Sequence, residues 1–184
     1  MNNNRRYSPA LRKTINEYLK KGREVEENFA SQLLSEVVWA TRQQDWREHW
    51  DVSGILPSEY GIKGSQKFDV KSIKKVNRSD SNTQDEFTWV EAKNTQGHIG
   101  WILGKADYIV FERFKSWLLV NRKELLDLVN DKVKSLGYVE GKKPYHVYSR
   151  PSMKDKLTLV PFKDIESLSS TQDIPKGTAN EVHS

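Results

Sequence analysis

An aspartate in one predicted strand and a glutamate and a lysine in the next have the types and spacing of a divalent-metal site. Asp69 lies in QKFDVKSIKKV, and Glu91 and Lys93 lie in FTWVEAK, with 21 residues between the aspartate and the glutamate. Successive side chains of a strand point to opposite faces, so Glu91 and Lys93 share a face. By the same alternation, Asp69 and Lys71 point away from the core. If the two segments form a hairpin, the carboxylates of Asp69 and Glu91 approach each other.

Converging carboxylates indicate the chemistry to expect at this site. They repel each other and shift their pKa values unless a cation lies between them, and Mg²⁺ prefers oxygen ligands of this kind. A lysine beside such an ion can orient or deprotonate a water molecule, or neutralise charge that develops on a phosphate. Taken singly, an E-x-K pair or an Asp69–Lys71 pair is more often a surface ion pair of little energetic weight. The combination, with an acidic helix before it, favours the metal site.

Hydropathy patterns predict the elements that must position these residues. Helical spacing after Ser8 and Pro9 predicts a short first helix, which Gly22 interrupts. A stronger amphipathic pattern predicts the main N-terminal helix from Val25 to about Ala40. Alternating and apolar runs predict strands at 66–76 and 87–93, which form the hairpin, and at 108–111, 117–120, 145–148 and 157–162.

The remaining signals complete a mixed α/β (α+β) fold. Asn121, with Glu124 three residues later, predicts a helix that ends at Gly137. Pro161 places the last predicted strand at a sheet edge or at a strand end. We therefore expect a mixed β-sheet with helices packed on it.

Length and composition limit the classes of protein that remain. The 184 residues predict one domain over residues 1–166, followed by a small, polar and disordered tail over 167–184. The absence of cysteine excludes a disulfide framework, a zinc finger and a thiol nucleophile. No stretch approaches the roughly 18 apolar residues of a membrane span, so we expect no membrane partner and a cytoplasmic protein, or a host-cell cytoplasmic one if a phage encodes it.

Positive charge is concentrated in two blocks, although the net charge is only +5. The blocks are residues 1–24 and 63–78, which flank the candidate acidic ligands. Each block alone could equally be a solvated face, but a polyanion that reaches a carboxylate cluster needs positive charge around it. The residues expected to contact a nucleic-acid backbone are Lys21, Arg23, Lys71, Lys74, Lys75 and Arg78.

A glutamate on an N-terminal helix, an aspartate on a strand and an E-x-K on the next strand together resemble the PD-(D/E)xK nucleases, which include restriction enzymes and archaeal Holliday-junction resolvases. The resemblance covers residues 20–120. The family's proline is absent, because Asp69 follows Phe68. KGREVEENF is similar to the start of the resolvase helix, in which a glutamate four residues after the glycine joins the metal shell. That position is Glu26 here, and Glu27 is the second choice.

The resemblance implies a restriction-endonuclease-like fold and an Mg²⁺-dependent (or Mn²⁺-dependent) nuclease. Asp69, Glu91 and Glu26 would bind the metal, and Lys93 would act on the attacking water. The products would be 5′-phosphate and 3′-hydroxyl ends, the substrate DNA rather than RNA, and a homodimer is expected by the same resemblance. His49 and Asp51 could supply a further metal ligand or phosphate contact, or could simply lie at the surface beside packed tryptophans.

Two other functions remain open from the sequence. One is a catalytically inactive nuclease-fold module that binds nucleic acid or a protein. The other is a structural protein whose carboxylates form surface ion pairs. The intact trio of Asp69, Glu91 and Lys93 argues against the inactive module, and the structural protein is the weaker alternative.

Overall fold

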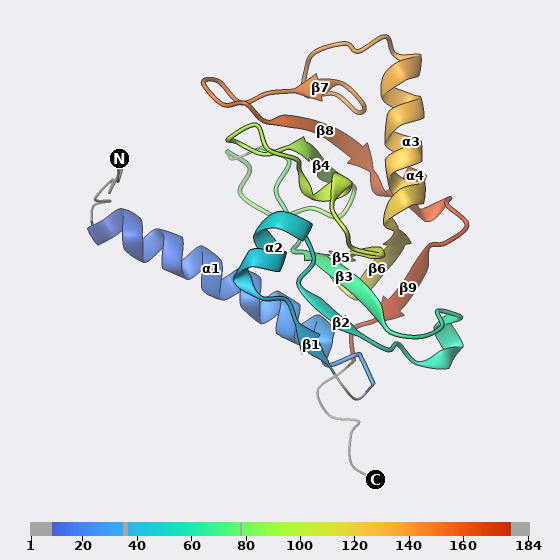
Figure 1. Ribbon diagram of the computed structural model, residues 1–184. Coiled ribbons are helices and arrows are strands. Elements are labelled where there is room, and N and C mark those ends of the chain that lie inside the picture. Colours follow the sequence, from blue (N-terminus) through green and yellow to red (C-terminus); the bar gives the residue numbers. More distant parts are fainter. Residues whose placement is uncertain (1–8, 35–36, 78, 178–184) are drawn as a thin grey trace.

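A six-stranded mixed sheet forms the centre of the computed structural model, which describes residues 9–34, 37–77 and 79–177 (Figure 1). The helices are α1 (Pro9–Ala30), α2 (Arg42–Glu48), α3 (Arg122–Ser135) and α4 (Phe162–Glu166). The strands are β1 (Val38–Trp39), β2 (Val52–Gly54), β3 (Gln66–Lys71), β4 (Phe87–Lys93), β5 (Tyr108–Glu112), β6 (Ser116–Asn121), β7 (Val147–Tyr148), β8 (Lys156–Pro161) and β9 (Gln172–Pro175). Two 3₁₀ turns are η1 (Ser58–Tyr60) and η2 (Trp101–Leu103). This confirms a mixed α/β class in which helices flank a mixed sheet.

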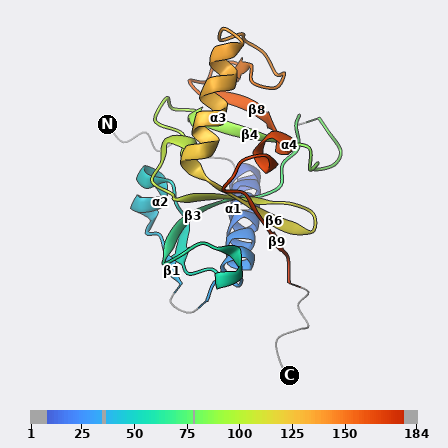
Figure 2. The same ribbon diagram turned by 90° about the vertical axis from the view of Figure 1, so that its right-hand side faces the viewer.

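Two sheets and two hydrophobic cores build the layers. The central sheet has the order β1-β2-β3-β5-β6-β9, in which β3 and β5 are parallel, and the smaller sheet has the order β4-β8-β7. One core lies between α1 and the central sheet, where Phe29 packs edge-on against Phe68 and Trp117. The other core lies between the opposite face, the smaller sheet and α3 (Figure 2). Both faces of the central sheet are therefore covered.

The predicted hairpin between residues 66–76 and 87–93 is wrong. β3 pairs with β2 and β5, whereas β4 pairs with β8 in the other sheet. Parallel strands need a long crossover between them, and the chain between β3 and β5 provides it. That crossover carries β4 into the second layer. The polar segment between β3 and β4 is therefore part of a crossover and not a hairpin turn.

The N-terminal helix also differs from its prediction. α1 is one continuous helix that runs through Gly22 and ends at Ala30, ten residues before the predicted end. A helical glycine costs about 1 kcal/mol relative to alanine but does not by itself end a helix. Beyond α1, Leu34 donates its backbone N–H to the carbonyl of Ile55, which ties this segment to the chain after β2. The predicted cap at Ser8 lies outside the described residues.

The second half of the chain follows the predicted elements closely. β5 and β6 form an antiparallel hairpin, and the side chain of Asn121 caps α3 by accepting from the N–H groups of Lys123 and Glu124. Pro161 lies at the end of β8. The predicted disordered tail is wrong for its first part, because β9 pairs with β6, and residues 178–184 lie outside the described part. Among the described residues, no helix combines the length and apolar character needed to cross a membrane.

One glycine holds the connection after β4 against the strand itself. A Cβ atom on Gly100 would lie 2.2 Å from the carbonyl oxygen of Glu91, which is backbone and cannot move aside cheaply. We expect Gly100→Ala to lower stability by about 2 kcal/mol or more, roughly 4–8 °C in Tm, as measured by thermal unfolding. Gly22→Ala is the matched control, because no atom lies within 4 Å of its added methyl group. It should stabilise the helix by about 0.5–1 kcal/mol, and equal losses in both variants would contradict this assignment.

Candidate functional site

The end of β3 places Asp69 and Lys71 on the face of the central sheet that meets the second layer. In the parallel pairing with β5, Asp69 lies beside Ile109 and Lys71 beside Phe111, and both of these partners belong to the core between the layers. Asp69 is only 2% exposed, which corrects the expectation that it points away from the core. The Nζ of Lys71 donates to its Oδ1 at 2.5 Å and lies 5.1 Å from the centre of the Trp101 ring. The ion pair is therefore largely removed from water.

Asp51, directly before β2, is the second carboxylate of the site. Its backbone N–H donates to the carbonyl of Phe68 at 2.8 Å, and its Oδ2 accepts from the N–H of Val70 at 2.7 Å. These two bonds hold the Asp51 side chain against the middle of β3, on either side of Asp69 in sequence. The β2–β3 pairing thus brings together two acids that lie 18 positions apart in the chain.

The two carboxylates of Asp51 and Asp69 compete for compensating charge. Burial raises the pKa of Asp69 well above its usual value, the Lys71 ammonium opposes that rise, and Asp51 adds to it. The Oδ2 of Asp69 is buried and has no hydrogen-bond donor among the described residues. Facing carboxylates need a shared proton or a cation between them. This arrangement is chemically suited to a hard divalent cation.

Lys71 keeps its positive charge in this environment. Burial alone would lower its pKa, but the carboxylates of Asp69 and Asp51, with a smaller contribution from Glu91, raise it above the ordinary value. Lys71 is therefore an ammonium group, a donor of hydrogen bonds rather than a free base. It is the common neighbour of acids that come from both layers.

Glu26 on α1 is the third acid of the site. We call Asp51, Asp69 and Glu26 the acidic cluster. Val25 and Phe29 on this helix are buried in the core beneath the central sheet, and Glu26 lies at the margin of that apolar stripe, half-buried. Burial, followed by the negative charge of Asp51, raises the pKa of Glu26 to about 7, and Arg23 at 3.5 Å opposes the rise. The structure therefore brings the sequence-predicted glutamate to the site.

Glu91 and Lys93 are placed differently from the prediction. The pairing of β4 with β8 is irregular between Glu91 and Lys93, and such a bulge breaks the period-two alternation that would put both on one face. Glu91 is half-buried, and burial raises its pKa while the charges of Lys71 and Arg150 lower it. Lys93 is exposed, and no ion pair joins it to the cluster in the described part of the chain. Glu91 thus reaches the site from the second sheet, without Lys93.

The residues present fit a metal ion by chemistry, although not as a preformed cage. Within the described ranges, no group of three or more His, Cys, Asp or Glu side chains is arranged to hold a metal ion. In the structure Lys71 supplies the compensating charge instead, and it binds only one oxygen of Asp69. The undonated Oδ2 and the neighbouring Asp51 are the observations that suit an additional cation.

Basic side chains border the acidic cluster on one side. Burial, followed by the positive charges of Lys71 and Lys21, lowers the pKa of Lys74, so α1 and the chain directly after β3 bring these lysines near one another. Arg23 lies over the Trp39 ring at 3.6 Å and bonds Glu27, while Lys75 donates to the carbonyl of Asp80 at 2.5 Å. Lys21 and Lys74 are therefore the better placed of the predicted backbone contacts, and Arg78 lies outside the described residues.

The sequence analysis named Lys93 as the lysine of the site and left Asp51 as an open alternative, whereas in the structure the lysine beside Asp69 is Lys71. The signal was present, because Asp69-Val70-Lys71 has the same acid-x-lysine spacing as Glu91-Ala92-Lys93. The deciding fact is the strand pairing, which sets Asp51 beside β3.

The charge balance of the site predicts a pH effect on the metal-free protein. The pKa of Glu26 is about 7 when folded against 4.5 as its ordinary value, so the unfolded chain releases this proton first as pH rises. The stability that the raised pKa of Glu26 gives to the folded state is therefore fully present below about pH 4.5 and is lost as the pH rises to 7. In EDTA, Glu26→Gln should be increasingly more stable than the wild type across this interval, as measured by Tm at each pH. A constant Tm difference would contradict the prediction.

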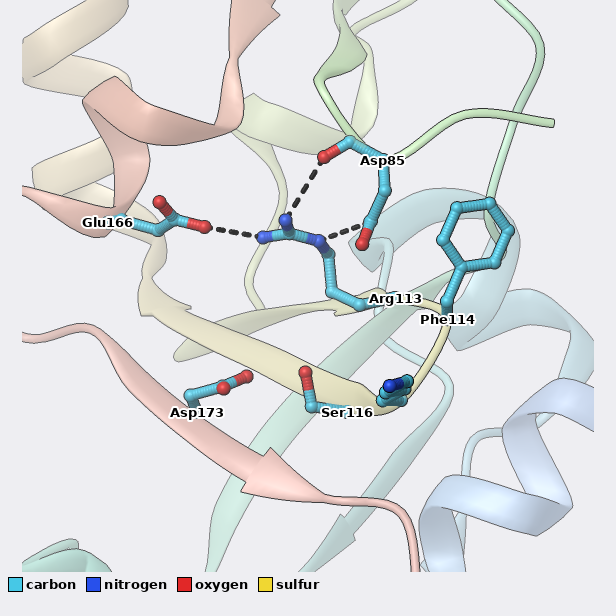
Figure 3. Close-up of a pocket in the computed structure, with 7 residues that line it drawn as sticks. Asp85, Arg113, Phe114, Ser116, Glu166 and Asp173 are labelled. Carbon is cyan, nitrogen blue, oxygen red and sulfur yellow. Dashed lines mark hydrogen bonds and ion pairs between the residues drawn. The ribbon is translucent and has the colours of Figure 1, made fainter.

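A pocket of about 290 Å³ elsewhere has a structural explanation (Figure 3). At its wall, Arg113 in the β5–β6 turn donates to Asp85 and to Glu166 of α4, and its guanidinium lies 4.4 Å from the ring centre of Phe162. The charges of this cluster are satisfied by one another. It ties the turn to α4 and to the chain before β4.

Comparisons of this chain with models of known protein families, with curated proteins and with solved structures found no match. The chemistry of the site is therefore inferred from its own residues.

Proposed function

We propose that this protein is a metal-dependent nuclease of the PD-(D/E)xK type, with a restriction-endonuclease-like fold, that hydrolyses phosphodiester bonds within DNA. The observation that carries the proposal is the buried Asp69, which has Asp51 on one side and the Lys71 ammonium on the other. Together with Glu26 on α1, these residues supply the order that the family signature requires: a helical glutamate, an aspartate and then an acid-x-lysine.

The proposed signature differs from the one expected from sequence alone. Asp51 takes the position of the first aspartate, and Asp69-Val70-Lys71 takes that of the (D/E)xK. The antiparallel pairing of β2 with β3 and the parallel pairing of β3 with β5 support this assignment, because they hold both acids in one covered sheet. Glu91 becomes an additional acid near Lys71, and Lys93 has no assigned role.

Each side chain has a task in this proposal. Asp51, Asp69 and Glu26 would hold the divalent ion, Mg²⁺ or Mn²⁺, whose charge would polarise a phosphate and acidify a water molecule. Lys71 donates hydrogen bonds from a charged group, which suits it to orient an attacking water or to stabilise charge on the phosphate oxygens. Trp101, beside the ammonium, limits access of bulk water to Lys71 and strengthens its interactions.

Lys21 and Lys74 would hold the nucleic-acid backbone beside the acids. Because each phosphate contact releases counterions, we expect Lys21→Glu with Lys74→Glu to weaken DNA binding and to flatten its salt dependence by roughly 1–2 in log–log slope. Titrations at several salt concentrations in EDTA measure this effect. The control is the double variant Lys115→Glu with Lys163→Glu, which changes the net charge by the same amount at positions far in sequence from Glu26, Asp51 and Asp69. An unchanged slope in the first pair would place the binding surface elsewhere.

The function is tested by incubating the protein with linear duplex, single-stranded, flap and four-way-junction DNA, and with RNA. Each substrate is incubated with Mg²⁺, Mn²⁺ or EDTA. Cleavage with either metal that stops in EDTA and in Asp69→Asn supports the proposal. Binding without cleavage of any substrate would favour an inactive nuclease-fold module instead.

A further inference from the structure

A pocket of about 310 Å³ opens beside the acidic cluster. It is formed by α2 and by the chain after β4, and its lining residues are Trp46, Arg47, His49, Asn94, His98 and Ile99. Trp46 is 58% exposed and Ile99 is 50% exposed, although both are large apolar side chains. Two large exposed apolar side chains that line one pocket form a patch of the kind that marks a ligand-binding surface.

The pocket combines an aromatic face with hydrogen-bond donors. Trp46 meets the His98 ring edge-on at 6.4 Å between centroids, and the Arg47 guanidinium lies 5.9 Å from the Trp46 ring. Asn94 uses its Oδ1 to accept from the N–H groups of Gln96 and His98, both at 3.0 Å. Its Nδ2 makes no hydrogen bond to any described residue, so it is free to donate.

The walls of this pocket are held in place before any ligand arrives. Nε2 of His49 lies 3.1 Å from the carbonyl oxygen of Ile99, which joins α2 to the loop after β4. His49 adopts a left-handed conformation with φ of 53°, and its backbone turns directly from α2 towards Asp51. A Cβ on Gly104 would lie 2.6 Å from the Cβ of His49, so a glycine is needed on that side. A prearranged pocket loses less entropy on binding.

Two segments that line the pocket lead to the acidic cluster. His49 lies two residues before Asp51, and Ile99 lies two residues before Trp101, whose ring centre is 5.1 Å from Nζ of Lys71. Burial, followed by the negative charge of Asp51, raises the pKa of Asp45, which is on the same helix as Trp46, and the charge of Lys71 opposes this rise. A strand with a phosphate at Lys71 and the proposed metal ion would therefore have a neighbouring nucleotide close to this pocket.

Building on the proposed nuclease function, we propose that this pocket binds an unstacked nucleobase of the substrate strand. The base would stack on Trp46, with Arg47 at the ring or its phosphate and Asn94 donating to the base edge. An aromatic side chain can stack on any of the bases, because every base has a π-face, so this contact does not depend on base identity. A base inside an intact duplex is stacked on its neighbours and cannot enter. The substrate class is therefore single-stranded or locally opened nucleic acid.

The test uses the matched variants Trp46→Ala and Phe114→Ala, because Phe114 is 59% exposed and belongs to a different pocket. Binding of labelled single-stranded and duplex DNA of one sequence is measured in EDTA by fluorescence anisotropy. We expect Trp46→Ala to weaken single-strand binding by about 5- to 100-fold and duplex binding by less than about twofold, with Phe114→Ala unchanged. α2 buries none of its own side chains, so the variant should remain folded.

A single abasic nucleotide moved along an oligothymidine locates the contact. The wild type should lose affinity at one position of the abasic nucleotide, and Trp46→Ala should no longer distinguish that position. Equal effects on duplex and single strands, or no effect of Trp46→Ala, would overturn the inference. Cleavage with Mg²⁺ is measured in parallel. Lys71-dependent cleavage with unaltered Trp46→Ala binding refutes the pocket alone, whereas Trp46-dependent binding without any cleavage refutes the nuclease alone.

Discussion

Replacing Lys71 with methionine should reduce metal-dependent cleavage by at least about 100-fold, whereas Lys93→Met should leave it within about threefold of the wild type. Both substitutions remove an ammonium group and keep an unbranched side chain. Of these two lysines, Lys71 contacts an acid of the cluster, through its bond of 2.5 Å to Asp69. The exposed Lys93 makes no such bond in the described part of the structure. Single-turnover cleavage rates at saturating protein measure the difference directly.

Comparing the Lys71 and Lys93 variants decides which of two segments, Asp69–Lys71 or Glu91–Lys93, is the catalytic (D/E)xK. Loss of activity in Lys93→Met with activity retained in Lys71→Met would show that Glu91 and Lys93 form the catalytic pair, as the sequence pattern first indicated. Because Lys71→Met leaves Asp69 without its counter-ion, its fold is checked by circular dichroism. Lys71→Arg keeps the charge and should remain folded, but its larger planar head group should restore little activity.

Binding of a divalent ion by Asp51 and Asp69 should raise the Tm of the protein by about 5–10 °C at 100 times the Kd. Asp51→Asn and Asp69→Asn should each lose most of this increase, because an amide keeps the shape of the side chain and removes the negative charge. Without metal, Asp51→Asn relieves the repulsion between the two carboxylates, whereas Asp69→Asn also removes the counter-ion of Lys71. Differential scanning fluorimetry with Mn²⁺ and with EDTA measures both effects.

Asp155 offers a matched control for the metal prediction. It is a buried aspartate that already has a cationic partner, since Arg150 forms an ion pair with it. Asp155→Asn should lower the Tm both with and without metal but should keep the increase that Mn²⁺ produces. If the wild type shows no increase at millimolar Mn²⁺, the metal proposal fails. If Asp51→Asn and Asp69→Asn keep the increase, the ion binds at other residues.

The local elements were largely predictable because their signals are local. Asn121 caps α3 through bonds to residues two and three positions later, and the β5–β6 hairpin joins two apolar runs by a short turn. Errors arose where an element depends on distant residues. α1 ends at Ala30 because the following chain packs and bonds elsewhere, although Leu33 and Val37 continue the apolar spacing.

The acidic cluster shows the same division. The sequence alone identified Asp69 and Glu26 as candidate metal ligands, and the structure brings both beside Asp51. Lys71 was expected only to contact phosphate. Asp51 was left open as a metal ligand, a phosphate contact or a surface residue. Two acid-x-lysine segments lie in strands, Asp69–Lys71 in β3 and Glu91–Lys93 in β4. No local property distinguishes them.

Sequence by itself determined the mixed α/β class, most of the helices and strands, and the acids and lysines available for chemistry, because these follow from side-chain type and short-range periodicity. The tertiary structure decided which lysine meets which acid. Pairing of β3 with β2 and β5 covers Asp69 on both sides, while pairing of β4 with β8 carries Glu91 and Lys93 into another layer. Strand partners are selected by burial of apolar surface over the whole molecule, and a one-strand difference in pairing changes which charges lie together.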